Sequence, residues 1–377
     1  MPTATNTNTN TLTDLLTHLV RFPTVSGDNA TNRAALDWVE QQLEGLPLDV
    51  KRLENHGVPA LVATTPAVTD PMAPKLWLLG HIDVVAGDPG DFNPHVKHGR
   101  LHGRGTHDMK FAIACFIALL QELGSDLKHY DLGLMLTADE EIGGEHGARW
   151  LVQDLGYRGG AVFVPDSSTP WKLEVSAKGI ARFDLTAVGQ AAHASRPWQG
   201  VNAVDELMSF INHLRTQVPA EPCGDQHHRH ATINLSTISG GMTPNQVPGS
   251  AQAKIDIRFT SDASIDHINA WISKAHTAVP SVTAKLFRTD APVSIPTNSA
   301  GQLFKNIALE VAGVKVTDHH AHGSSDARWF AWKNIPTVNV GVTGSGYHTS
   351  PEWVDLADLT RYYEVTRRFV NDWARVN

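Results

Sequence analysis

The sequence predicts an α/β fold in which a domain with a covered mixed sheet is interrupted by a smaller α+β domain. Three observations support this prediction. The chain has 377 residues, which exceeds one ordinary hydrophobic core. Its first half alternates apolar strand-like runs with helical patterns. From about Val175 apolar and polar residues alternate instead. After about Arg288 the chain again alternates apolar strand-like runs with helical patterns.

The first part of the chain alternates helices with short apolar runs. Helical spacing is found over residues 11–23, 32–46, 108–123 and 147–155, and apolar runs are found over 75–85, 131–141 and 160–168. Buried strands that alternate with helices are typical of a sheet covered on both faces. In such sheets, functional sites form at the carboxyl ends of the strands.

The middle of the chain has the pattern of half-exposed antiparallel strands. These strands are expected over residues 179–189, 231–241 and 250–260, with helices over 201–218 and 264–279. We therefore predict a domain over 1–174 and 289–377 that is built from both ends of the chain. The segment 175–288 forms the insert.

Composition excludes several classes of protein. The formal net charge is −8, which disfavours nucleic acid or an anionic membrane as a partner. The Thr/Asn-rich start lacks the features of a signal peptide, and no apolar run reaches the ~18 residues of a membrane span. The chain has only two cysteines, and one of them, Cys115, lies in a predicted apolar helix. This cysteine usage is typical of a protein from a reducing compartment. We expect a cytoplasmic protein.

Polar side chains follow buried elements at several places. They are His81, Asp83, Asp108, Glu140, Glu141, Asp166 and His348. A set of imidazoles and carboxylates suits Zn²⁺, or related ions such as Co²⁺ or Mn²⁺. Two divalent ions about 3.5–4 Å apart would also relieve the repulsion among so many carboxylates. A single strand-end His or Asp is more often a turn cap, so the prediction depends on the whole set.

Four segments resemble the motifs of the M20 metallopeptidase and deacylase family. They are "GHIDVV", "GRLHGRGTHDMK", "TADEEIGG" and "YHTSPEWV", and they occur in the family's order over nearly the whole chain. The family includes acetylornithine deacetylase, succinyl-diaminopimelate desuccinylase and several dipeptidases. The resemblance implies a zinc-peptidase-like catalytic domain with a dimerisation or lid domain inserted in it. It also implies a homodimer that hydrolyses a small-molecule substrate, an N-acyl amino acid or a short peptide.

The resemblance implies a role for each strand-end residue. His81 and Asp166 would bind the first of two divalent ions, most simply Zn²⁺, and Asp83 would orient His81. Asp108 would bridge both ions. Glu141 and His348 would complete the second ion site. Glu140 would be the general base that takes a proton from the bridging water and returns it to the leaving amine. Asp139 is expected to make only a loop hydrogen bond.

Three residues of the insert have implied roles in the reaction. The segment "VGQAAHASRPWQGVNAV" resembles the part of the family that carries an oxyanion-stabilising histidine, here His193, which often acts from the partner subunit. Asn245 and Arg258 resemble substrate-binding positions. Arg258 could equally be a surface charge on a strand.

Some positions depart from the family pattern. His107 stands where Ser is common, and we expect its side chain to point away from the metals. Phe111 stands where Gly or Ser is common and is expected to narrow the space near the helix start. Asp166 stands where deacylases usually have Glu, whereas Asp is commoner in aminopeptidases and dipeptidases.

Two alternatives to the N-acyl amino acid hydrolase stay open. One is a dipeptidase or aminopeptidase that acts on free amino termini, and the other is a non-catalytic binder of a peptide or amino acid. A serine hydrolase is disfavoured because the sequence has no G-x-S-x-G segment.

Overall fold

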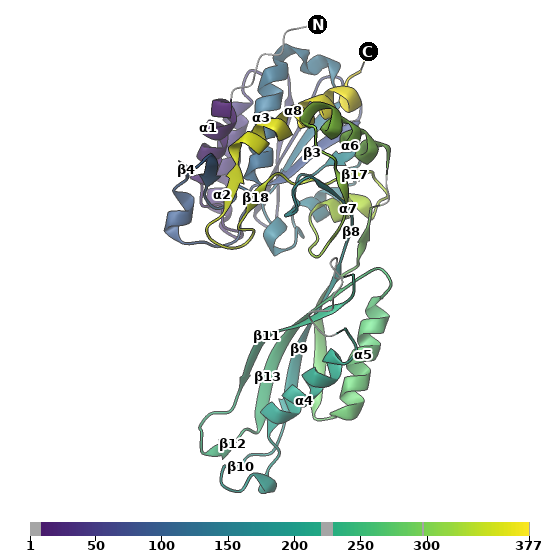
Figure 1. The fold of residues 1–377 in the computed structure, drawn as a ribbon. Coiled ribbons are helices and arrows are strands. Elements are labelled where there is room, and N and C mark those ends of the chain that lie inside the picture. The colour runs from purple at the N-terminus through teal and green to yellow at the C-terminus, as the bar shows by residue number, and fades with distance from the viewer. Residues whose placement is uncertain (1–8, 220–228, 296–297, 377) are drawn as a thin grey trace. The chain divides into compact units, whose positions relative to one another are not determined.

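The structure is a computed structural model that describes residues 9–219, 229–295 and 298–376 (Figure 1). The Thr/Asn-rich start over 1–8 lies outside these residues. The chain divides into two compact units. The first comprises Met1–Val175, Ile295–His319 and Ser325–Asn377, and the second comprises Ser176–Ser294 and His320–Ser324. The second unit thus extends beyond the predicted insert of 175–288.

The first unit is built on a six-stranded mixed sheet of order β1-β2-β6-β3-β7-β17. The strands are β1 (Asp49–Asn55), β2 (Val58–Thr64), β3 (Leu76–His81), β6 (Leu132–Thr137), β7 (Val162–Phe163) and β17 (Thr337–Val338). β3 is parallel to both β6 and β7, while β2 is antiparallel to β6. The predicted mixed α/β fold class is confirmed.

Five helices pack with one face of this sheet in a shared apolar core. They are α1 (Thr9–Val20), α2 (Asn29–Gln42), α3 (Lys110–Leu123), α6 (Ser299–Ala312) and α8 (Leu356–Ala374). α3 is buried on every side from Lys110 to Leu120, Cys115 included, which explains its continuous apolar sequence.

A smaller apolar cluster covers the other face of the sheet. It joins Trp77 and Met135 to a π-helical turn, Trp150–Asp154, and to α7 (Ala327–Ala331). Both faces are therefore buried, which is why the strands read as near-continuous apolar runs. The helix predicted over 147–155 is found over 148–154, and its larger part is this π-helical turn.

A second sheet of the first unit has the order β18-β19-β5-β4. Its strands are β18 (Gly344–Ser345), β19 (Trp353–Asp355), β5 (Arg100–His102) and β4 (His95–Lys97). It brings the segment before α3 next to the segment that follows His348, although the two are far apart in the sequence.

The second unit contains an antiparallel sheet of order β11-β13-β9-β14. Its strands are β9 (Gly179–Val188), β11 (Thr232–Gly240), β13 (Ser250–Phe259) and β14 (Val282–Asp290). α4 (Ala203–Arg215) and α5 (Ile265–Ala278) pack on one face and bury its apolar residues (Figure 1). The opposite face is polar, which accounts for the alternating pattern of the sequence. β11 is an edge strand.

Short elements complete the chain. They are β8 (Lys172–Ala177), β10 (Ala192–His193), β12 (Gln246–Val247), β15 (Val293–Ser294), β16 (Thr317–Ala321) and the 3-10 helices Pro89–Phe92, Gly124–His129, Glu140–Ile142 and Pro197–Gln199. Across the described ranges, no helix is both long and apolar enough to cross a membrane.

Candidate active site

The parallel strands of the first unit deliver polar residues to one edge of the sheet. His81 is the last residue of β3, Glu140 and Glu141 form a 3-10 turn after β6, and Asp166 follows β7. Because β3, β6 and β7 run in the same direction, these side chains meet at the carboxyl edge. Asp108 lies in the loop that precedes α3.

His81, Asp108 and Asp166 form the first group of potential metal ligands, and one donor atom of each lies within 4.8 Å of the others. His81 Nε2 lies 3.2 Å from Asp108 Oδ1 and 3.9 Å from Asp166 Oδ2. All three residues are buried. The His81 Nδ1–H donates to the carbonyl of Asp83 at 2.9 Å, which turns Nε2 toward the carboxylates.

Asp108, Glu141 and His348 form the second group, within the same 4.8 Å limit. His348 Nε2 lies 2.8 Å from Glu141 Oε2 and 3.2 Å from Asp108 Oδ2. Asp108 thus turns one carboxylate oxygen toward each group. His348 has a left-handed backbone, with φ of +57°, which is uncommon for a residue other than glycine.

The charges of this region fit divalent cations. Burial, with repulsion from Asp108, raises the pKa of Asp166 to about 7. Burial and the nearby Asp166 raise the pKa of Glu140 well above its ordinary value, and burial likewise raises that of Glu141. Buried carboxylates in this number are unfavourable unless cations neutralise them. The imidazole and carboxylate donors match the preferences of Zn²⁺ and of related ions.

Asp83 holds the 3-10 turn in place. Its Oδ1 and Oδ2 accept the backbone N–H groups of Glu140 and Glu141, both at 3.2 Å, and Oδ2 also accepts the Ser26 hydroxyl at 2.6 Å. Its carboxylate lies 3.5 Å from His81 Nδ1, farther than its own carbonyl. The Asp83 side chain therefore serves the turn as well as the histidine.

Glu140 lies beside the buried guanidinium group of Arg328. Its Oε1 lies 3.7 Å from Nη1 of Arg328, a residue that is 3% exposed. Arg328 also donates to the carbonyl of Gly143 at 2.7 Å. Arg328 therefore links α7 to the turn that carries both glutamates.

Glu352 organises the loop that carries Asp108. Its carboxylate accepts backbone N–H groups from Gly105, His107 and Asp108 at 2.7 to 3.1 Å and pairs with Arg104 at 2.8 Å. No sequence pattern predicts a role for Glu352, Arg328 or Tyr347, although Glu352 and Tyr347 lie inside the motif "YHTSPEWV".

The structure also places the residues that depart from the family pattern. His107 donates from Nε2 to the carbonyl of Val342 at 3.1 Å, so it points away from the ligand groups as expected. Phe111 is 1% exposed and packs edge-to-face on Tyr362 in the core. The expectation that Phe111 narrows the space at the helix start was wrong, because its side chain packs into the core. Asp139 makes the expected loop hydrogen bonds, to the N–H groups of His146 and Gly147.

His193, Asn245 and Arg258 all lie in the second unit. His193 is exposed on β10, and its Nδ1 lies 2.8 Å from the Ser195 hydroxyl. The carbonyl of Asn245 accepts the N–H of Ala194, so the two segments are neighbours. Arg258 pairs with Asp256 at 2.6 Å and is partly buried on β13.

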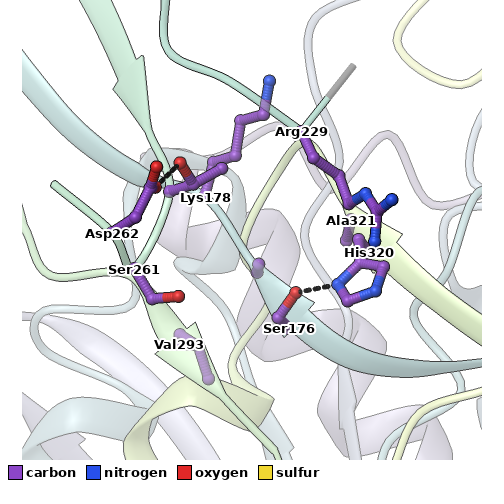
Figure 2. Close-up of a pocket in the computed structure, with 10 residues that line it drawn as sticks. Ser176, Lys178, Arg229, Ser261, Asp262, Val293, His320 and Ala321 are labelled. Carbon is purple, nitrogen blue, oxygen red and sulfur yellow. Dashed lines mark hydrogen bonds between the residues drawn. The ribbon is translucent and has the colours of Figure 1, made fainter. Parts of the chain in front are cut away.

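A pocket of about 470 Å³ lies within the second unit (Figure 2). Lys178, Arg229, His320 and Asp262 are among its lining residues, and the Ser176 hydroxyl contacts His320 Nδ1 at 2.6 Å. None of the strand-end residues that form the two ligand groups lines this pocket.

Two groups of potential metal ligands that share a carboxylate, at the carboxyl edge of a covered sheet, are an arrangement typical of metal-dependent hydrolases. The chain belongs to peptidase family M20/M25/M40, whose sequence model matches residues 77–372. Members of this family are hydrolases, and the chain is one of them.

Curated relatives cover nearly the whole chain. The succinyl-diaminopimelate desuccinylase of Parvibaculum lavamentivorans is 27% identical over 379 residues, which covers 93% of each chain. That of Rhodospirillum centenum is 28% identical and covers 94% of this chain and 95% of its own.

Solved structures show the same fold. Aminopeptidase PepT from Bacillus cereus matches with a TM-score of 0.78 at 20% identity, and covers 97% of this chain and 98% of its own. The M20 metallo-carboxypeptidase Sso-CP2 from Sulfolobus solfataricus matches with a TM-score of 0.75 at 16% identity, and covers 94% and 97%.

Proposed function

We propose that the protein is a dinuclear metal-dependent amidohydrolase that cleaves the amide bond of an N-acyl amino acid. The observation that carries this proposal is Asp108, whose two carboxylate oxygens face different groups of potential ligands. A shared carboxylate is the usual bridge of a two-metal hydrolase. The curated relatives, which are named desuccinylases, favour an acylated amino acid as substrate.

His81, Asp108 and Asp166 would hold the first ion, and Asp108, Glu141 and His348 the second. When bound, two divalent ions would polarise the scissile carbonyl and lower the pKa of a water molecule. This donor set favours Zn²⁺, with Co²⁺ or Mn²⁺ as substitutes.

Glu140 is the proposed general base. It belongs to neither ligand group, yet it lies beside Glu141 in the same turn. It would accept a proton from the attacking water and later deliver it to the leaving amine. Arg328, 3.7 Å away, would keep the carboxylate directed into the site during both transfers.

The second unit would supply the remaining groups. His193 would stabilise the oxyanion from the partner subunit of a homodimer, and Asn245 and Arg258 would bind the substrate's polar ends. Arg258 already has Asp256 as a partner, so its proposed role requires it to exchange that contact for the substrate.

A peptidase acting on free amino termini is the second candidate. Asp166 favours it, because aspartate at this position resembles the aminopeptidase and dipeptidase branches. The Zn²⁺-loaded and Co²⁺-loaded protein should therefore be assayed against N-succinyl and N-acetyl amino acids and against unblocked dipeptides. Cleavage of the dipeptides alone would replace the N-acyl proposal with the peptidase.

The first prediction concerns Glu140. Glu140→Gln should retain about two metal ions per chain and lose turnover by at least ~10²-fold, since it keeps the shape of the side chain but removes the base. Metal content by elemental analysis and steady-state kinetics measure the two effects. Glu44→Gln, an exposed substitution, is the control. Undiminished turnover in Glu140→Gln would refute the assigned base.

A further inference from the structure

Tyr347 binds one of the proposed metal ligands. Its hydroxyl donates to Oδ1 of Asp166 at 2.8 Å. The other oxygen of that carboxylate, Oδ2, lies 3.9 Å from His81 Nε2. A carboxylate oxygen accepts hydrogen bonds, so the Tyr347 hydroxyl is the donor in this contact.

The ring of Tyr347 is held between two imidazoles. It stacks on His348, with ring centroids 4.8 Å apart and an interplanar angle of 23°. It meets His107 edge-to-face, with centroids 6.0 Å apart and an angle of 85°. Tyr347 thus contacts a ligand of each group, Asp166 through its hydroxyl and His348 through its ring.

His107 is fixed in turn by its surroundings. Its Nε2–H donates to the Val342 carbonyl at 3.1 Å, and its backbone N–H donates to Glu352 at 2.7 Å. A Cβ added at Gly344 would lie 2.4 Å from His107 Cδ2, so a residue without a side chain is required there.

We propose that Tyr347 is a positioning residue that occupies one oxygen of Asp166 and leaves only Oδ2 for the first metal ion. This inference rests on the proposed two-metal function. A carboxylate held in this way would offer a bound ion one oxygen donor instead of two. That ion would then keep a coordination position for the substrate, as catalytic metal sites require. His107 and Gly344 place the ring that makes this possible.

The test is Tyr347→Phe, which removes the hydroxyl and keeps the ring. We expect its affinity for the first Zn²⁺ ion to fall about 10- to 100-fold, as for other outer-sphere partners of metal ligands, with the second ion little affected. Competition against a chromophoric chelator measures both affinities. In the Co²⁺-substituted protein the visible absorption should weaken, because Asp166 is free to bind through both oxygens and raise the coordination number.

The matched control is Tyr130→Phe. Tyr130 is buried, whereas Tyr347 is half-buried, and the Tyr130 hydroxyl donates to Asn371 Oδ1 at 3.0 Å, away from the ligand groups. It should bind both ions and absorb as the unsubstituted protein does. Thermal unfolding of the metal-free forms should show that both variants fold.

Two results would overturn the inference. One is an unchanged affinity and an unchanged Co²⁺ spectrum in Tyr347→Phe, and the other is an equal loss in both variants, which would mark a general effect on stability. The proposed function fails separately, if the unsubstituted protein binds no ions or hydrolyses no amide.

Discussion

At the scale of single residues, the candidate site combines side chains at the ends of buried strands with side chains from segments far away in the sequence. Residues such as His81 and Asp166 follow buried strands, and the carboxyl ends of parallel strands meet at one edge. Glu352, by contrast, accepts N–H groups from a loop about 245 residues earlier in the sequence. Such a contact depends on the direction of a side chain in the folded core, and no local pattern encodes it.

Glu174 gives a residue-scale prediction about pH. It accepts the Asn339 side-chain amide at 2.9 Å, and Asn339 also binds the backbone of Asp166. Burial, then repulsion from Asp166, raises the pKa of Glu174 from 4.5 to about 8. The folded chain therefore binds more protons than the unfolded chain between these values. Glu174 thus makes the metal-free protein less stable as pH rises through this window.

Glu174→Gln should remove this dependence while keeping an oxygen that accepts from Asn339. Relative to the variant, the unsubstituted protein should lose up to about 1.4 kcal/mol of unfolding free energy for each pH unit in that window. Urea unfolding of the metal-free proteins at several pH values between 5 and 8 measures the difference. A gap that stays constant with pH would contradict the prediction.

At the scale of elements, the strands and helices around the site were predicted well, because their apolar periods are long. The α3 helix begins at Lys110, close to the start predicted for it. The chain bends after β6 at Gly143 and Gly144, which have φ of +115° and +65°, values that glycine adopts readily. The 3-10 turn that aims both glutamates was not predictable, because it depends on Asp83 and Arg328 from other segments.

The element-scale prediction compares two left-handed glycines of the first unit. A Cβ added at Gly144 would lie 2.4 Å from Asp326 Oδ1, whereas one at Gly156, with φ of +83°, meets only Met72 Cε at 4.0 Å. Gly156→Ala should cost about 1–2 kcal/mol of unfolding free energy from its backbone conformation alone. Gly144→Ala should cost more and also reduce turnover, because Asp326 and the adjacent glutamate turn must shift. Urea unfolding and kinetics test this, and equal costs would count against it.

At the scale of the whole molecule, the α+β insert was visible because its alternating strands differ from the buried runs around it. Its assembly with a second copy is a proposal. If His193 acts from the partner subunit, each site needs residues from two chains. A heterodimer of Glu140→Gln with His193→Ala would then have one complete site.

This heterodimer, purified through two different tags, should recover about half the activity of the unsubstituted dimer. Each variant alone should be nearly inactive. A heterodimer as inactive as its parents would place His193 in its own subunit's site. A fully active monomer in light scattering would remove the dimer from the mechanism.

The order of the ligands along the chain has a consequence for synthesis. During synthesis, the last residue of the first group to be added is Asp166, which precedes the insert. The last residue of the second group is His348, which follows the insert. If the two groups hold metal ions as proposed, a nascent chain would carry all protein donors for the first ion before the last donor for the second has been made. A partially translated chain would then lack the second ion site on which the proposed hydrolysis depends.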